Sequence, residues 1–195
     1  MPSIVIAAHN EEQLLGSTLT ALLADEHSPS LEVIVSANGC TDRTVTVARD
    51  AGVIVVERPE PGKAGALNAG DAVAATFPRV YLDADIIVPP GGLGKVFSLF
   101  CERPGRIPPL AVVQARRVNT AGRPWLVRAY FAINEQLPAF RDGLFGRGFI
   151  ALSREGRSRF EQFPLMIADD LFLDSQYSSS EKAQANDVVV VVEAP

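Results

Sequence analysis

The sequence predicts an α/β fold, a single domain whose mostly parallel central sheet is flanked by helices and whose second half is mixed. Short apolar runs typical of buried strands alternate with helical segments three times over about residues 1–88 and end in a strand. Such alternation indicates a parallel sheet wrapped by helices. The 195 residues, 47% hydrophobic and 21% charged, suffice for one domain with a sizeable core.

The first half alternates between strands and helices. Leucines at helical spacing, among them Leu15, Leu19 and Leu22, define the first helix. Asn10 is expected to cap that helix, Thr41 or Asp42 the second, and Gly52 to end the second. The strands are expected at 3–8, 31–35, 53–56 and 80–82, and the helices at 11–24, 41–51 and 63–75.

The second half is less regular. Trp125, Tyr130 and Phe131 are expected in the core, and the alternative is that one of them lines the site. The chain stops directly after a five-valine strand, and we expect missing sequence downstream of Pro195. Helices are expected at 91–100, 124–137 and 169–177, strands at 111–117, 149–152 and 188–192, and loops at 103–109 and 178–186.

Polar clusters follow three of the predicted strands, at residues 8–11, 36–39 and 83–85. Ligands of open parallel sheets bind beyond the carboxyl ends of the strands. Asp83 and Asp85 are separated by one residue, so a strand would direct both carboxylates to one face. Two carboxylates in an apolar stretch need a cationic partner, and Mg²⁺ or Mn²⁺ with phosphate fits. The alternative is a solvated acidic turn after the strand. Taken alone, the Asp-x-Asp spacing favours this alternative.

Lys63 opens a small-residue helix, and a lysine beside free backbone amides suits phosphate. Neither a Walker P-loop nor a dinucleotide fingerprint is present in the sequence. Close helix packing explains Gly65 and Gly70 equally well, but it does not explain Lys63. Asn38, at a strand tip, is a candidate for contact with a nucleotide base.

Asp169 and Asp170 form a second acidic pair at a predicted helix start. One of them could serve as a general base for an acceptor hydroxyl, whereas simple capping is the alternative for Asp169. The glycine-rich segment 143–149 could shape an acceptor pocket, with Arg147 beside Gly148 facing a phosphate or carboxylate.

Composition excludes several classes of function. A net charge of −5 without a long basic run disfavours nucleic-acid binding. Two cysteines provide no disulfide framework, so a reducing cytoplasm is expected. No apolar run approaches the ~20 residues of a membrane span, although peripheral contact with the inner face of a membrane stays open. A histidine-rich zinc site is excluded, because the sequence has only two histidines. His9 could be a ligand or a base, and a structural role is the alternative.

The motifs, in this order, resemble the family 2 glycosyltransferases of the GT-A fold, a Rossmann-like architecture. The resemblance covers Ser3 to Val192. It implies a nucleotide-sugar-binding half over about 1–88 and an acceptor half over about 89–195. It implies nucleotide contacts at Ala8, His9, Asn10, Glu11, Asn38, Lys63 and Asp83, metal ligands Asp85 and Asp83, catalytic residues Asp170 (the base) and Asp169, and acceptor contacts at Arg147 and Gly148.

The activity implied by this resemblance is inverting, Mn²⁺- or Mg²⁺-dependent transfer from a nucleotide-diphosphate sugar to an acceptor hydroxyl. The acceptor would be a sugar, a lipid-linked molecule or a small molecule, in exopolysaccharide or cell-envelope synthesis. A UDP-sugar is the first choice of donor, but Ala37-Asn38 replaces the acidic pair usual before Gly39. The sequence lacks Gln-x-x-Arg-Trp, which disfavours a processive synthase. A sugar-phosphate nucleotidyltransferase and an inactive nucleotide-binding homologue are the alternatives.

Overall fold

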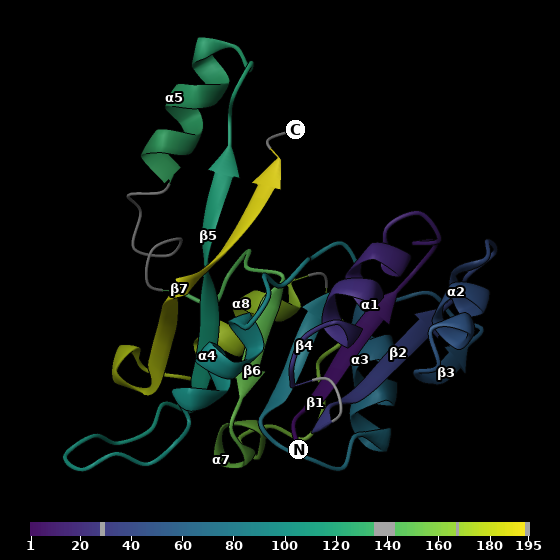
Figure 1. Ribbon diagram of the computed structural model, residues 1–195, viewed down its shortest axis with the longest axis horizontal. Coiled ribbons are helices and arrows are strands. Elements are labelled where there is room, and N and C mark those ends of the chain that lie inside the picture. Colours follow the sequence, from purple (N-terminus) through teal and green to yellow (C-terminus); the bar gives the residue numbers. More distant parts are fainter. Residues whose placement is uncertain (28–29, 135–142, 167, 194–195) are drawn as a thin grey trace.

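The computed structural model describes residues 1–27, 30–134, 143–166 and 168–193. They contain a seven-stranded sheet in the order β3-β2-β1-β4-β6-β5-β7 (Figure 1). All strand pairs are parallel except the two that β6 makes with β4 and β5. The strands are β1 (Ser3–Ala8), β2 (Glu32–Asn38), β3 (Ile54–Arg58), β4 (Arg79–Asp83), β5 (Ala111–Asn119), β6 (Phe149–Leu152) and β7 (Lys182–Glu193).

Helices cover both faces of this sheet. The helices are α1 (Leu15–Leu23), α2 (Thr44–Asp50), α3 (Lys63–Val73), α4 (Gly92–Ser98), α5 (Trp125–Asn134), α7 (Arg154–Arg157) and α8 (Asp169–Ser175). One apolar core lies between the sheet and α1, α2 and α4, and a second lies between the sheet and α3 and α8. Alternation along the strands supplies both cores: Ile4 and Ile6 of β1 face the first, and Val5 faces the second. The predicted α/β fold with a mostly parallel sheet is confirmed.

Close packing explains a glycine of α3. A Cβ atom on Gly70 would lie 2.5 Å from Val5 Cγ1, so α3 lies directly on β1. The packing interpretation of this glycine is therefore correct.

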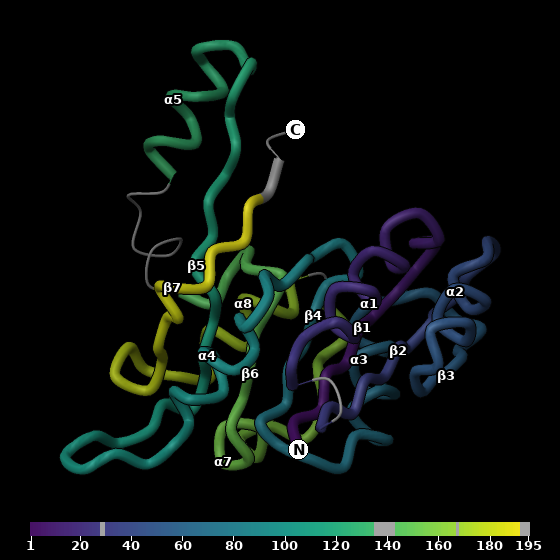
Figure 2. The backbone as a smooth tube through the Cα atoms, viewed as in Figure 1, coloured from purple at the N-terminus to yellow at the C-terminus, as the bar shows by residue number. Residues whose placement is uncertain are grey.

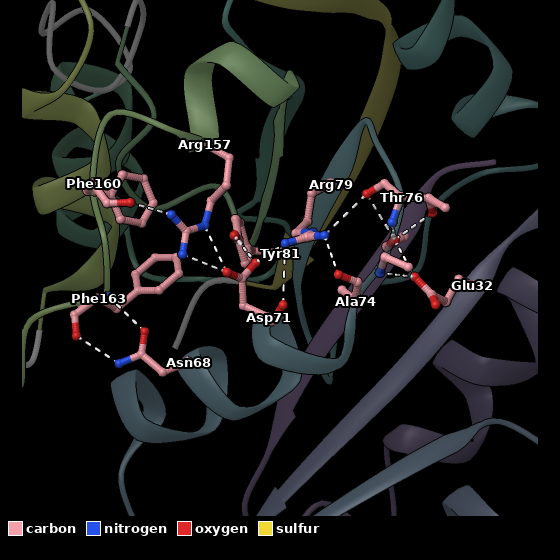
Figure 3. Close-up of polar contacts among 12 residues, drawn as sticks. Glu32, Asn68, Asp71, Ala74, Thr76, Arg79, Tyr81, Arg157, Phe160 and Phe163 are labelled. Carbon is pink, nitrogen blue, oxygen red and sulfur yellow. Dashed lines mark hydrogen bonds and ion pairs between the residues drawn. The ribbon is translucent and has the colours of Figure 1, made fainter.

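A buried ionic network ties α3 to the amino-terminal edge of the sheet (Figure 3). Asp71 Oδ1 accepts hydrogen bonds from Arg79 Nη1 and Tyr81 Oη, both at 2.7 Å. Its Oδ2 accepts hydrogen bonds from Arg157 Nε at 2.9 Å and Nη2 at 2.6 Å. The side chains of Asp71, Arg79 and Arg157 are 10%, 7% and 13% exposed, so one carboxylate holds two nearly buried cations.

β5 and β7 extend beyond the other strands as a two-stranded arm with α5 at its tip (Figures 1 and 2). β6 pairs with β5 only over Ala111–Val113, whereas β7 pairs with β5 as far as Asn119. Trp125 and Tyr130 of α5 are 72% and 61% exposed, so their expected place in the core is wrong. Among the described residues no helix is long and apolar enough to cross a membrane.

Several predicted boundaries are corrected. The first helix begins at Leu15, after a turn, and Asn10 does not cap it. The residues expected as a loop at 178–186 instead form a short 3₁₀ helix, Ser179–Glu181, and the first part of β7. Helix α5 is described to Asn134, and the expected residues 135–137 lie outside the described part.

Candidate active site

Lys63 joins two candidate carboxylates, Asp83 and Asp169, at the charged edge of the sheet, which is the edge where β1, β2 and β4 have their carboxyl ends. It is the first residue of α3, and its Nζ lies 2.8 Å from Asp83 Oδ1 and 3.3 Å from Asp169 Oδ2. Burial alone would lower the pKa of Lys63, but the two carboxylates raise it. Burial raises the pKa of Asp169, and the charge of Lys63 counteracts part of that rise. The expected nucleotide and catalytic segments therefore meet at this lysine.

A first cavity, the Glu11 pocket, has a volume of about 440 Å³. It is lined by Ala7, His9, Glu11, Asn38, Pro61, Gly62, Lys63, Asp83, Ala84 and Asp85. Partial burial, with Asp85, Asp42 and Asp83 nearby, raises the pKa of Glu11. Most of the residues expected to contact a nucleotide are thus gathered around one cavity. Ala8 and Asn10 lie beside it without lining it.

Asn38 holds the base of the Glu11 pocket together. Its side chain is buried, with Nδ2 donating to Ala8 O and Oδ1 accepting from Gly62 N, both at 2.8 Å. The main-chain oxygen of Asn38 accepts a 2.6 Å hydrogen bond from His9 Nδ1. The amide therefore joins the end of β1 to the loop before α3, and its contact with a base stays a prediction.

The loops after β1 and β2 interlock through side-chain to backbone hydrogen bonds. Asn10 Oδ1 accepts from Thr41 N at 2.8 Å, and Thr44 Oγ1 accepts from Glu11 N at 2.8 Å. Asn10, with a φ of 55°, adopts the left-handed conformation that asparagine tolerates. These contacts fix Glu11 at the rim of the pocket.

A second cavity, the Asp170 pocket, has a volume of about 260 Å³. It is lined by Lys63, Leu67, Tyr81, Leu82, Asp83, Asp85, Ile86, Arg116, Gly146, Arg147, Gly148, Phe149, Ile150, Asp169, Asp170 and Leu173. The two pockets share Lys63, Asp83 and Asp85. All four candidate carboxylates of the metal and catalytic sets line this one cavity.

Helix α8 fixes the glycine-rich segment that closes the Asp170 pocket. Asp170 Oδ2 accepts from Gly146 N, and Asp174 Oδ1 accepts from Leu144 N, both at 2.7 Å. Positions i and i+4 lie on one face of a helix, so two carboxylates one turn apart hold alternate residues of the segment. Asp170 is therefore both a candidate base and an anchor.

Gly148 lies against the first carboxylate. Its oxygen accepts from Asp83 N at 2.8 Å, and a Cβ atom on it would lie 3.2 Å from Asp83 Oδ2 and 2.6 Å from Ile86 Cγ1. Its φ of 66° also favours glycine. Arg147 is buried, its Nε donating to Gly143 O and its oxygen accepting from Gln114 Nε2. Both expected acceptor residues thus border the pocket.

The structure adds Arg116 to the site, which the sequence did not single out. Its Nη1 donates to Gly146 O at 2.7 Å, and it lines the Asp170 pocket. The signal that identified Asp83 also applies to Arg116, because β5 runs in the same direction as β4 and Arg116 follows its buried residues.

The carboxylates of the site suit a divalent cation that phosphate oxygens also bind. Among the described residues, no three acidic, histidine or cysteine side chains converge as a complete metal site. Asp85 is exposed and makes no hydrogen bond or ion pair with the described part of the chain, while Asp83 contacts Lys63. Mg²⁺ and Mn²⁺ are commonly held by one or two carboxylates together with phosphate oxygens, so Asp83 and Asp85 fit such an ion.

The sequence model of glycosyl transferase family 2 matches residues 3–155. The chain belongs to this family. Family membership decides for a glycosyltransferase over the nucleotidyltransferase that the sequence had left as an alternative.

Curated relatives of this family 2 glycosyltransferase are also named glycosyltransferases. An uncharacterized glycosyltransferase of Mycobacterium tuberculosis is 34% identical over 129 residues, 65% of this chain and 54% of the relative. The 4,4'-diaponeurosporenoate glycosyltransferase of Staphylococcus aureus is 33% identical over 90 residues, 43% of this chain and 24% of that protein. The chain thus spans about half the length of its M. tuberculosis relative.

Solved structures confirm the GT-A fold of this glycosyltransferase. A mannosyltransferase from Pyrobaculum calidifontis, in complex with GDP-Man and Mn²⁺, has a TM-score of 0.79 at 23% identity, covering 100% of this chain and 57% of that one. The glucosyl-3-phosphoglycerate synthase of M. tuberculosis, with Mn²⁺, UDP and glucosyl-3-phosphoglycerate, has a TM-score of 0.68 at 24% identity, covering 100% and 70%.

Proposed function

We propose that this glycosyltransferase moves a sugar from a nucleotide-diphosphate sugar to an acceptor hydroxyl with inversion. One observation carries the proposal: the Glu11 and Asp170 pockets share Lys63, Asp83 and Asp85. In this assignment the nucleotide occupies the Glu11 pocket, the acceptor occupies the Asp170 pocket, and the diphosphate lies at the shared residues.

The charged side chains provide the steps of an in-line displacement. Asp83 and Asp85 would hold Mn²⁺ or Mg²⁺, which when bound offsets the charge of the departing diphosphate. Lys63, already between two carboxylates, adds a fixed positive charge beside that group. Asp170 takes the proton of the acceptor hydroxyl. The oxygen of that hydroxyl forms the new bond to the anomeric carbon as the bond from this carbon to the diphosphate breaks. A single displacement inverts the anomeric configuration.

Asp170 is the favoured base because of its position. Oδ2 accepts from Gly146 N and Oδ1 from Leu171 N, and because each carboxylate oxygen has two acceptor sites, capacity for a hydroxyl remains. Asp169 is 8% exposed and lies against Lys63, which suits a residue that positions the cation.

The base of the donor is the finer part of the proposal. Similar structures hold different donors: GDP-Man in the Pyrobaculum mannosyltransferase, and UDP-GlcNAc in TarS of S. aureus, with a TM-score of 0.75 at 14% identity covering 100% of this chain and 58% of TarS. A UDP-sugar is our first assignment, with a sugar, a lipid-linked molecule or a small molecule as acceptor. We place the reaction in the cytoplasm, at the inner face of the membrane, in envelope or exopolysaccharide synthesis.

Calorimetric titration tests the donor half. UDP, GDP and dTDP are titrated with and without Mn²⁺ into the full chain, into Asp85→Ala and into the control Asp50→Ala, at an exposed residue of α2. We expect metal-dependent binding of one nucleotide, lost in Asp85→Ala and kept in Asp50→Ala. Binding of none of them would contradict the assignment.

Asp170→Asn tests the catalytic half. The asparagine keeps one oxygen that can accept from Gly146 N and loses the acceptor for Leu171 N. Asp170 does not line the Glu11 pocket, so donor binding should persist. Turnover should fall by about 10²–10⁴-fold, the usual contribution of a general base. Unchanged turnover would remove Asp170 from that role.

A further inference from the structure

Helix α5 carries an apolar face that the described part of the chain leaves exposed. Leu126 and Ile133 are 63% and 64% exposed, as open to solvent as Trp125 and Tyr130, and none of the residues of α5 is buried. Leu126, Tyr130 and Ile133 follow one another at intervals of four and three residues, so they share one side of the helix. We name the side chains of Trp125, Leu126, Tyr130 and Ile133 the α5 face. Single exposed apolar residues are ordinary, whereas four large ones together on one helix indicate an interaction site.

The other side of α5 faces the arm. Phe131 and Asn134 line a cavity together with Val118 of β5 and Val189 of β7. The α5 face is therefore a second apolar surface, separate from the side by which the helix contacts the strands. Helix α5 also lies at the far end of the arm from the other strands of the sheet (Figure 1). A helix in this position can meet a flat surface before the body of the molecule does.

Positive charge accompanies the α5 face. The sequence from 111 to 134 contains four arginines and no aspartate or glutamate, in a chain whose net charge is −5. Arg123 precedes α5 and Arg128 lies within it, and both side chains are exposed. An anionic surface would therefore attract the arm while it repels the more acidic remainder of the chain, which orients the molecule with α5 toward that surface.

This combination fits a lipid surface better than a second copy of the chain. Tryptophan, tyrosine and leucine on one side of a helix, with arginine and no acidic residue beside them, are typical of helices that lie in the interface of a bilayer. Tryptophan and tyrosine prefer that level because one end of the side chain is apolar and the other is polar. A symmetric contact between two α5 faces would instead bring the arginines of both copies together, which is unfavourable.

We propose that the α5 face docks the protein on an anionic lipid bilayer, with its apolar side chains in the interface and the arginines beside the lipid phosphates. Strand β5 joins α5 to the candidate active site, because Arg116 of β5 lines the Asp170 pocket. Docking therefore holds this pocket at a fixed distance from the membrane surface. That consequence for sugar transfer rests on the proposed function, whereas the docking surface itself does not.

The intrinsic fluorescence of the chain tests the proposal, because Trp125 is its one tryptophan. The full chain is mixed with vesicles of phosphatidylcholine, and with vesicles of equal parts phosphatidylcholine and phosphatidylglycerol. With the anionic vesicles we expect a blue shift of the tryptophan emission and quenching by lipids that are brominated on their acyl chains. Binding to the neutral vesicles should be at least about tenfold weaker, because each arginine near an anionic surface contributes about fivefold. No blue shift, or equal binding to both kinds of vesicle, would overturn the proposal.

Matched substitutions assign the binding to α5. Leu126→Ser and Ile133→Ser should each weaken vesicle binding by about tenfold, because each removes an apolar side chain from the interface. Ile107→Ser, at a 92% exposed residue of the loop before β5, is the control and should bind as the parent does. Arg128→Gln should weaken binding to anionic vesicles by about fivefold, with Arg106→Gln in the same loop as its control. All five side chains are exposed, so the variants should keep the fold. Binding that is unchanged in both α5 serine variants, or lost equally in Ile107→Ser, would refute the site.

Docking and sugar transfer can fail separately. Vesicle binding through α5 without any nucleotide binding would support docking and refute its role in sugar transfer. Metal-dependent nucleotide binding without vesicle binding would leave the donor assignment in place and refute docking. Light scattering in the absence of lipid tests the other occupant of the surface. A dimer that Leu126→Ser converts to a monomer would assign the α5 face to a second copy and refute the inference.

Discussion

Asp71→Asn should destabilise the fold strongly, because it removes the carboxylate that is paired with two nearly buried arginines in the network of Figure 3. Breaking a buried ion pair by removing one partner costs about 3–5 kcal/mol. Arg79 keeps a hydrogen bond to Ala74 O, and Arg157 keeps one to Phe160 O, so we expect the lower end of that range. For a chain of this size, about 3 kcal/mol corresponds to a fall in Tm of about 6–12 °C.

The loss should also depend on pH. Burial alone would raise the pKa of Asp71, but hydrogen bonds from Arg157, Tyr81 and Arg79 lower it below its usual value. A carboxylate whose folded-state pKa is lowered stabilises the protein above its unfolded-state pKa, and this contribution is lost as the pH falls through the lowered value. The difference between parent and variant should therefore be full near pH 7 and shrink below about pH 4.

Urea unfolding followed by circular dichroism at pH 7 and at about pH 2.5 measures both effects. Asp50→Asn on the exposed surface of α2 is the matched control and should change the free energy of unfolding by less than about 0.5 kcal/mol. A loss below about 1 kcal/mol for Asp71→Asn, or one independent of pH, would refute the ionic account of this network.

Three further changes probe the site itself. Gly148→Ala places a methyl group 2.6 Å from Ile86 Cγ1 at a positive φ, so we expect a loss of about 1–3 kcal/mol in urea unfolding and weaker metal-dependent nucleotide binding; parent-like values would show that the segment shifts freely. Lys63→Met removes the charge that lowers the pKa of Asp169, so that pKa should rise further in a ¹³C carboxyl titration, and an unchanged value would contradict the ion pair. Asn38→Ala leaves Gly62 N without its partner and should cost about 1–3 kcal/mol, checked by thermal unfolding, whereas a neutral effect would show that the amide is dispensable.

The sheet and the charged edge could be predicted because their signals are local. Short apolar runs alternate with segments whose apolar residues have helical spacing. Polar residues follow strands whose carboxyl ends meet at one edge of the sheet. Asp83 ends β4 as expected, while Asp85 lies in the following turn and still lines the same pockets. Period and polarity alone therefore predicted that these residues lie together at one edge of the sheet.

The errors arose where distant segments decide the local structure. Asn10 has the character of a helix cap, but its side chain bonds Thr41 of the neighbouring loop instead. The polar stretch before the valines of β7 becomes a strand because it pairs with β5 from Ala111 onward. Asp71 and Arg157 are 86 residues apart, and a single sequence carries no local signal for such a pair.

Helix α3 and strand β4 run in opposite directions and are joined by ion pairs at both ends. Lys63 to Asp71 rises about 12 Å along a helix, and Arg79 to Asp83 about 13 Å along a strand, so the two pairs match in spacing. The Asp71–Arg79 pair is almost buried, whereas Lys63 and Asp83 are 45% and 38% exposed. One end of the unit therefore holds the fold, and the other can exchange its partner for a ligand. Substitutions at the exposed end can therefore change ligand binding while the buried end preserves stability, so binding and robustness can evolve independently.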